Sequence, residues 1–190
     1  MVILLGGVSS TGKTLMAQKL LERYKIPYFS IDHLKMGLFR GDSNCGFTPM
    51  DSSEVIGEKL WPIIKGIIMT NIENNQNIII EGCYLLPHLV KDFEKEYLDQ
   101  IISVLIGFSA DYIKEKFVSN IIEYRNAIET RNYEESRQIA QFIKEHEELR
   151  KKCIENGAEY FEINSDYEME IQRAYDFIDN SIMKMNLKSN

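Results

Sequence analysis

Residues 7–14, with the sequence GVSSTGKT, match the pattern G-x-x-x-x-G-K-[ST] of loops that bind phosphate groups. Glycines let the backbone turn so that its N–H groups point at phosphate oxygens. Lys13 can reach the β- and γ-phosphates, and the Thr14 hydroxyl can bind Mg²⁺. The pattern therefore predicts a site for ATP and Mg²⁺ rather than a plain glycine-rich turn. The residues expected to contact the nucleotide are Gly7, Val8, Ser9, Ser10, Thr11, Gly12, Lys13, Thr14 and Leu15.

Two acidic residues follow other apolar segments of the chain. Asp32 comes after the segment 28–31, and Glu81 comes directly after the segment 77–80. Asp32 is placed either to orient the hydroxyl of a phosphoryl acceptor or to cap the helix that follows it. Glu81 is placed to bind Mg²⁺, directly or through water, or to contact the acceptor; the alternative is a solvated carboxylate at a strand end. We expect Asp32 to act in catalysis, and Glu81 to bind the metal together with Thr14.

The acceptor side of the site is predicted from residues near these two carboxylates. A polar loop that contains glycines, 40–51, follows Asp32 closely and could hold an acceptor. Basic residues beside this loop would suit an anionic acceptor, and a plain surface connection is the alternative. The residues expected to bind the acceptor are Asp32, His33, Lys35, Arg40, Glu81 and Gly82.

Three arginines, Arg125, Arg131 and Arg137, lie in the polar stretch EYRNAIETRNYEESRQ. Because a guanidinium group can bind phosphate through two hydrogen bonds, this stretch could be a mobile lid that places arginines on the transferred phosphoryl group. A solvated helix with surface ion pairs is the alternative. We expect a helical lid at about 122–140, with Arg125 and Arg131 in catalytic roles.

Short apolar segments alternate with helical segments along the chain, which is typical of an α/β protein with a parallel sheet. The apolar segments are continuous rather than alternating, as expected of strands covered on both faces. Ligands of such sheets bind beyond the carboxyl ends of the strands, where the candidate residues are found. The predicted strands are 2–5, 28–31, 77–80, 101–107 and 159–163. The predicted helices are 13–24, 33–39, one capped by Ser52 or Ser53 that reaches Asn74 with a kink or restart at Pro62, one capped by Ser109, and 166–185.

The length of 190 residues suits one domain, 1–190, with a sizeable core. The net charge is −7 and no long basic run is present, which argues against a general nucleic-acid-binding role. Because no apolar run approaches the ~20 residues that cross a membrane, we expect no membrane partner. The three cysteines form no C-x-x-C pair, which favours a reduced, cytoplasmic setting.

The order of these features resembles that of small-molecule kinases with the P-loop NTPase fold, such as adenylate, shikimate and gluconate kinases. The segments IDHLKMGL (31–38) and IIEGCYLLP (79–87) resemble those of 2-phosphoglycerate kinases. The zeta-toxin group, which phosphorylates UDP-N-acetylglucosamine, is similar in outline. The resemblance implies a five-stranded parallel sheet in the order 2-3-1-4-5, with helices on both faces. It assigns ATP and Mg²⁺ to Gly7, Gly12, Lys13 and Thr14, the acceptor side to Asp32, and the floor of the site to Glu81 and Gly82.

Together, these features predict an ATP-dependent kinase that phosphorylates a hydroxyl group of a small, anionic molecule similar to 2-phosphoglycerate. A toxin-like kinase that acts on a nucleotide sugar would share the same catalytic parts, and it is the second hypothesis. The third is a non-catalytic switch in which ATP binding reshapes a partner surface. No tail or coiled-coil pattern in the sequence supports the switch.

Overall fold

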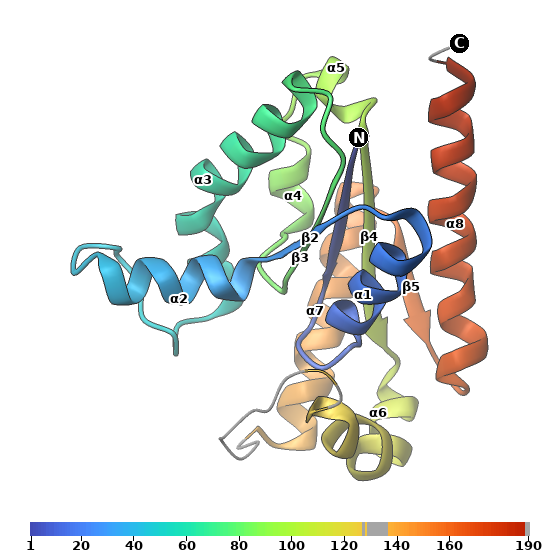
Figure 1. Ribbon diagram of the computed structural model, residues 1–190. Coiled ribbons are helices and arrows are strands. Elements are labelled where there is room, and N and C mark those ends of the chain that lie inside the picture. The colour runs from blue at the N-terminus through green and yellow to red at the C-terminus, as the bar shows by residue number, and fades with distance from the viewer. Residues whose placement is uncertain (127, 129–136, 189–190) are drawn as a thin grey trace.

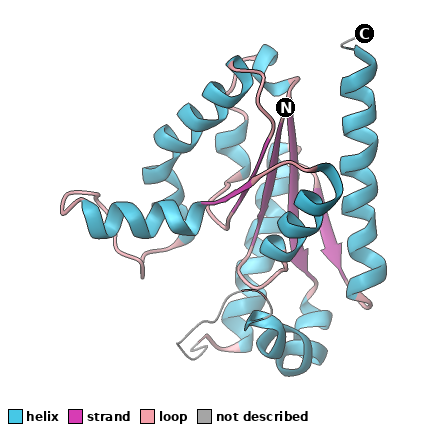
Figure 2. Cartoon of the chain, viewed as in Figure 1, coloured by secondary structure: helices cyan, strands magenta, loops and turns pink. Residues whose placement is uncertain are grey.

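The structure, a computed structural model, describes residues 1–126, 128 and 137–188. Figure 1 shows a parallel sheet with helices on both of its faces, and Figure 2 shows the same view coloured by secondary structure. The strands pair in the order β2-β3-β1-β4-β5, all parallel, which confirms the predicted fold class and strand order. Their bounds are β1 (Val2–Gly7), β2 (Tyr28–Ser30), β3 (Ile78–Glu81), β4 (Ile101–Phe108) and β5 (Tyr160–Ile163).

Helices connect these strands and cover the sheet (Figure 1). The α-helices are α1 (Lys13–Tyr24), α2 (Ile31–Gly41), α3 (Ser53–Glu73), α4 (Pro87–Val90), α5 (Lys95–Leu98), α6 (Ala110–Lys116), α7 (Ile139–Asn156) and α8 (Tyr167–Lys188). A π-helix, Phe117–Ile122, and a 3₁₀ helix, Glu123–Asn126, follow α6. Among the described residues, no helix has both the length and the apolar character that crossing a membrane requires.

The central strand β1 is buried along its whole length and contributes to two apolar cores. Ile3 and Leu5 belong to the core that includes residues of α1 and α8. Val2 and Leu4 belong to the core that includes residues of α3. This division follows from the alternation of side chains along a strand. Burial on both faces explains why the predicted strands are continuous apolar runs.

Side-chain caps confirm two of the predicted helix starts. Ser52 Oγ accepts a hydrogen bond from Val55 N at 3.3 Å before α3, and Ser109 Oγ accepts one from Tyr112 N at 3.2 Å before α6. Each cap satisfies an N–H group that has no partner within its helix. Helix α3 continues through Pro62 as one element, so the structure shows no restart there.

Some predicted boundaries are wrong. Helix α2 begins at Ile31 with Ser30 in the N-cap position, so Asp32 lies in the first helical turn and does not cap the helix. A carboxylate in the first turn is stabilised by the positive end of the helix dipole. Strand β3 extends to include Glu81. The short helices α4 and α5 were not predicted, because segments of four residues are too short to show helical periodicity.

The middle of the predicted lid, 122–140, lies outside the described residues, which here are 122–126, 128 and 137–140. Arg131 is one of the residues that the structure does not describe. Arg125 belongs to the 3₁₀ helix Glu123–Asn126, and its side chain also lies outside the described part. Arg137 is described and directly precedes Gln138, the N-cap residue of α7. The role of the lid therefore remains a prediction, and Arg137 is the one of its three arginines whose side chain is described.

Candidate active site

The glycine-rich loop connects β1 to α1 at the carboxyl edge of the sheet. A Cβ atom at Gly7, where φ is 137°, would lie 2.3 Å from the Ile106 carbonyl oxygen of the neighbouring strand. A Cβ atom at Gly12, where φ is 83°, would lie 2.0 Å from the Tyr167 hydroxyl. Both positions also have backbone conformations that favour glycine. Packing against the backbone of the neighbouring strand therefore requires glycine at position 7, whereas the positive φ and the Tyr167 hydroxyl favour it at position 12.

Lys13 lies across this loop and is nearly buried. Its Nζ donates hydrogen bonds to the Val8 carbonyl at 2.8 Å and to the Thr11 hydroxyl oxygen at 3.4 Å. Thr11 in turn donates a hydrogen bond to the same Val8 carbonyl at 2.9 Å. The ammonium group is thus held inside the turn of the loop, next to the first turn of α1, which contains Thr14.

The loop fits a triphosphate group with a divalent metal ion. Within the described residues, the buried Ser9 hydroxyl has no hydrogen-bond partner and is available to an oxygen ligand. A lysine ammonium, a hydroxyl at the start of α1 and the N-terminus of a twelve-residue helix all favour an anion at the same place. The Thr14 hydroxyl is of the chemical type that joins a Mg²⁺ ion in such loops.

Tyr167, the first residue of α8, supports the loop from the other end of the chain. Its hydroxyl donates a hydrogen bond to the Thr11 carbonyl at 3.1 Å and occupies the space beside Gly12. Burial raises the pKa of Tyr167, so the phenol remains a hydrogen-bond donor. The sequence gives no signal for this contact, because its partners are 156 residues apart.

The acceptor side of the site contains a hydrogen-bonded group of three side chains, which we call the Asp32 network: Asp32, Lys35 and Tyr84. Lys35 Nζ donates to Asp32 Oδ1 at 2.7 Å and to the Tyr84 hydroxyl oxygen at 2.7 Å. The Tyr84 hydroxyl donates to the same Asp32 Oδ1 at 3.2 Å. Lys35 and Tyr84 are buried, whereas 41% of the Asp32 side chain is exposed. The predicted residues Asp32 and Lys35 are thus brought together, and Tyr84 was missed.

The electrostatic surroundings keep Asp32 ionised. Burial alone would raise the pKa of this carboxyl group, but Lys35, Lys13 and the Tyr84 hydroxyl together hold the pKa below its ordinary value. Lys13 is among the charges that lower this pKa, in agreement with the topology: the phosphate loop follows β1 and Asp32 follows β2, at the same edge of the sheet, with only β3 between the two strands. A bound phosphate and an acceptor hydroxyl group could therefore be adjacent.

Glu81 and Gly82 lie between the loop and the Asp32 network. Glu81 ends β3 and is 2% exposed, so it is not the solvated carboxylate of the alternative interpretation. In the sheet it is level with Leu5 of β1 and Ser30 of β2. A Cβ atom at Gly82 would lie 2.9 Å from Ile31 Cβ, so this glycine permits α2 to pack closely against β3.

Two of the predicted acceptor residues are exposed on α2. His33 lies in its first half and Arg40 in its last turn. Figure 1 shows that α2 extends away from the sheet, so its last turn lies at a distance from the phosphate loop. Neither residue takes part in the Asp32 network.

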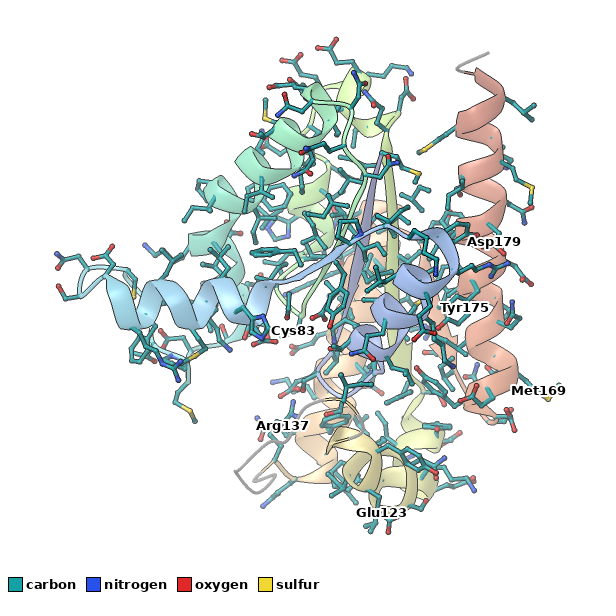
Figure 3. All side chains as sticks on the ribbon, viewed as in Figure 1. Cys83, Glu123, Arg137, Met169, Tyr175 and Asp179 are labelled. Carbon is teal, nitrogen blue, oxygen red and sulfur yellow. The ribbon has the colours of Figure 1, made fainter. Side chains whose placement is uncertain are left out.

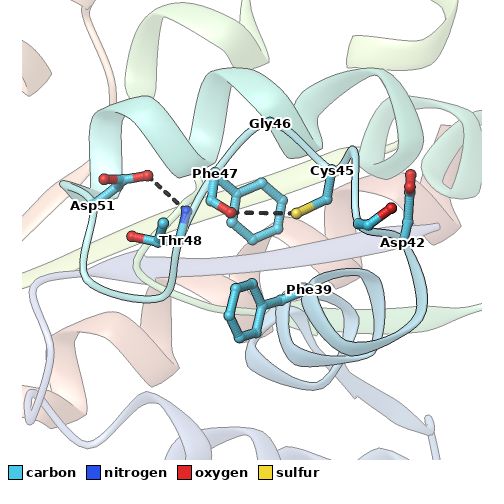
Figure 4. A pocket seen from close by; sticks show the side chains of 8 residues that line it. Phe39, Asp42, Cys45, Gly46, Phe47, Thr48 and Asp51 are labelled. Atoms are coloured by element: carbon cyan, nitrogen blue, oxygen red, sulfur yellow. Dashed lines mark hydrogen bonds between the residues drawn. The ribbon is translucent and has the colours of Figure 1, made fainter.

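The loop after α2 forms a separate pocket of about 420 Å³, seen in Figure 4. Asp51 Oδ2 accepts a hydrogen bond from Thr48 N at 2.7 Å, and the Cys45 thiol donates one to the Phe47 carbonyl at 3.2 Å. The described residues that line the pocket include two carboxylates and no lysine or arginine, so its charge does not favour an anion. They are Phe39, Asp42, Ser43, Cys45, Gly46, Phe47, Thr48 and Asp51.

Arg137, labelled in Figure 3, forms an ion pair with Glu145 at 2.7 Å and lies 4.6 Å from the centre of the Phe142 ring. Phe142 packs against the buried His146, whose Nδ1 accepts a hydrogen bond from Phe108 N at 2.8 Å. The imidazole is neutral: burial, reinforced by the charges of Lys13 and Arg137, lowers the pKa of His146 to about 3. The charges of Arg137 and Lys13 therefore both lower the pKa of the buried His146.

The turn after β5 is held by Glu170 of α8. Its carboxylate accepts hydrogen bonds from the backbone N–H groups of Asn164 and Ser165, at 3.1 and 2.8 Å, and from the Ser165 hydroxyl at 2.7 Å. Burial would raise the pKa of Glu170, but these hydrogen bonds lower it to about 2. The side chains that follow β5 are thus fixed by the start of α8.

Solved structures of small-molecule kinases share this fold. A gluconokinase from Sinorhizobium meliloti 1021 matches 100% of this chain and 97% of its own, with a TM-score of 0.56 and 13% identity. A shikimate kinase from Aquifex aeolicus matches 96% of this chain and 99% of its own, with a TM-score of 0.54 and 14% identity. A sugar kinase from Janibacter sp. HTCC2649 matches 94% of each chain, with a TM-score of 0.51 and 14% identity.

These similarities establish the fold of P-loop small-molecule kinases. No protein-family model matches the chain, and no curated protein matches it. The activity must therefore be inferred from the side chains of the site itself.

Proposed function

We propose that the protein is an ATP-dependent phosphotransferase that transfers the γ-phosphoryl group to a hydroxyl group of a small molecule. The observation that carries this proposal is the proximity of two unlike parts. A phosphate-binding loop with Lys13 lies within electrostatic reach of Asp32, a partly exposed carboxylate that remains ionised. Phosphoryl transfer depends mainly on positioning and on neutralising charge, and these two parts supply both.

The proposed roles follow from the chemistry of each side chain. Bound Mg²⁺·ATP would supply the phosphoryl group and part of the charge neutralisation. Lys13 and the backbone N–H groups of residues 7–14 would hold its phosphates, and Thr14 and Glu81 would hold the metal ion, Glu81 directly or through water. Asp32 would accept a hydrogen bond from the acceptor hydroxyl and align it for attack. Of the three arginines in the predicted lid segment, Arg137 is the one whose side chain is described, and it is paired with Glu145.

We infer that the acceptor is a small hydroxy compound, with anionic molecules similar to 2-phosphoglycerate as the first candidates. Lys35 supports this inference, because its ammonium group has three N–H donors and two of them bind Asp32 and Tyr84. The third could bind an anionic group of the acceptor. The gluconokinase and shikimate kinase with the same fold are named for acceptors that are hydroxy acids.

The first experiment is a γ-phosphoryl transfer assay with Mg²⁺·ATP. The acceptor panel contains 2-phosphoglycerate, gluconate, shikimate, nucleoside monophosphates and UDP-N-acetylglucosamine. We expect labelling of one acceptor, its loss in Lys13→Ala, and a decrease of about a hundredfold in kcat for Asp32→Asn with little change in ATP affinity. His88→Gln, a change at a partly exposed residue paired with Glu58, is the control. ATP binding with no transfer to any acceptor would favour the switch hypothesis instead.

A further inference from the structure

The two oxygens of the Asp32 carboxylate have different surroundings. Oδ1 accepts hydrogen bonds from both Lys35 Nζ, at 2.7 Å, and the Tyr84 hydroxyl, at 3.2 Å. Oδ2 receives no hydrogen bond from the residues that the structure describes. The Asp32 side chain is 41% exposed, and Oδ1 is bound to two buried side chains, which leaves Oδ2 as the oxygen that can accept a hydrogen bond from an acceptor molecule.

The Tyr84 hydroxyl links the two charged members of the Asp32 network. It accepts a hydrogen bond from Lys35 and donates one to Asp32, so both of its strong hydrogen-bonding directions are used. Burial, the neighbouring Cys83 and the Asp32 carboxylate all raise the pKa of Tyr84, so the phenol stays protonated. Lys35 has only donors, and Tyr84 is committed as a donor towards Asp32. The orientation of the carboxylate is therefore fixed from one side.

We propose that Tyr84 and Lys35 are positioning residues that fix Asp32 so that Oδ2 alone faces the acceptor hydroxyl group. This inference rests on the proposed function, since it concerns the orientation of the same acceptor. It goes beyond that function by naming the acceptor-facing oxygen and the two side chains that select it. Neither residue needs to contact the reacting atoms to have this effect.

The arrangement has a specific consequence for Asp32→Asn. Lys35 cannot accept a hydrogen bond, so the new amide oxygen must take the Oδ1 position. The amide NH₂ group then takes the Oδ2 position and presents a donor where the acceptor hydroxyl needs a hydrogen-bond acceptor. In Lys35→Met, the amide is released from this constraint and can rotate. Asp32→Asn should therefore cost at least several-fold less activity in the Lys35→Met background than in the unaltered protein.

The test compares Tyr84→Phe with Tyr97→Phe. Tyr97 is a matched control, because its hydroxyl donates to the Glu73 carboxylate at 2.7 Å on the exposed surface. We expect Tyr84→Phe to decrease kcat about tenfold without changing the KM for ATP, and we expect Tyr97→Phe to have no effect. The acidic limb of the pH profile should move to higher pH in Tyr84→Phe and in Lys35→Met, since both groups lower the pKa of Asp32.

A second measurement separates this inference from the proposed function. The Asp32 carboxyl carbon is titrated by NMR without any acceptor, and its midpoint should rise in Tyr84→Phe but not in Tyr97→Phe. A raised midpoint in a protein that phosphorylates no acceptor would overturn the proposed function and leave the network intact. An unchanged midpoint would show that the network does not act on Asp32. An unchanged kcat in an active enzyme with a raised midpoint would show that the network has no positioning role.

Discussion

Tyr167 holds the phosphate loop through one hydroxyl group, which donates a hydrogen bond to the Thr11 carbonyl at 3.1 Å. A hydrogen bond of this kind contributes about 1 kcal/mol. We predict that Tyr167→Phe loosens the loop and raises the KM for ATP about fivefold, with kcat nearly unchanged. Steady-state kinetics with varied ATP would measure the effect, with Tyr97→Phe as the control. A fivefold decrease in kcat with an unchanged KM for ATP would show that Tyr167 acts on the transfer step instead.

Individual site residues differ in how far the sequence predicts them. The contacts of Lys13 lie within a contiguous motif, so its place could be predicted from local pattern alone. Asp32 was predicted because it follows a strand, at the edge where parallel sheets bind ligands. Tyr84 was not predicted, since its partners Asp32 and Lys35 lie 52 and 49 residues away and meet only in the folded chain.

At the scale of elements, His146 connects α7 to the end of β4. Its Nδ1 accepts the Phe108 N–H group at a position beyond the end of β1, and its ring packs between Phe108 and Phe142. The connection requires a neutral imidazole, because a protonated ring has no acceptor. His146 therefore links α7, which begins at the end of the predicted lid, to β4, the strand beside β1 and its phosphate loop.

This connection predicts a pH-dependent stability. The folded-state pKa of His146 is about 3, against an ordinary value near 6.5, so the unfolded chain binds the proton first as the pH falls. The free energy of unfolding should therefore decrease by up to about 1.4 kcal/mol per pH unit below pH ~6.5 and level off near pH 3. Denaturant unfolding at several pH values would measure it. In His146→Asn the side chain still offers a hydrogen-bond acceptor but does not titrate, so the free energy of unfolding should depend less on pH in this range. His88→Gln should leave this pH dependence unchanged.

The elements themselves were largely predictable, and their failures have physical reasons. Helices with strong N-caps began where Ser52 and Ser109 predict. The start of α2 was placed too late, because Ser30 takes the cap position without a side-chain hydrogen bond and leaves no clear sequence signal. The predicted lid has little apolar periodicity, and its described residues include the end of a π-helix, a 3₁₀ helix and the start of α7.

At the scale of the whole molecule, ligand binding should increase the free energy of unfolding and the Tm. A ligand that binds only the folded state at 100 times its Kd adds about 2.7 kcal/mol. For a chain of this size that amount raises the Tm by about 5–10 °C. We predict such an increase with Mg²⁺·ATP, and its loss in Lys13→Ala, both measured by thermal unfolding. An equal increase in Lys13→Ala would place the nucleotide somewhere other than the loop.

The strand order was also predictable, whereas the acceptor was not. The continuous apolar strands indicate a parallel sheet, the resemblance to P-loop kinases implies the strand order, and the structure confirms it as β2-β3-β1-β4-β5. The acceptor depends on the shape and charge near the Asp32 network, and one fold supports many substrates. The pocket formed by the loop after α2 illustrates the difficulty, because its position in the sequence favours an acceptor site and its acidic lining does not favour an anion.

The central place of β1 has a consequence for how the chain folds during synthesis. Its partners are β3, which begins at Ile78, and β4, which begins at Ile101. At synthesis rates of about 5–20 residues per second, roughly 5–20 seconds pass between the synthesis of β1 and that of β4. Until β3 has been made, the apolar strand Val2–Gly7 has no partner strand in the growing chain, and until β4 has been made it has a partner on one side at most. Aggregation of the incomplete chain on the ribosome is therefore a hazard of this topology.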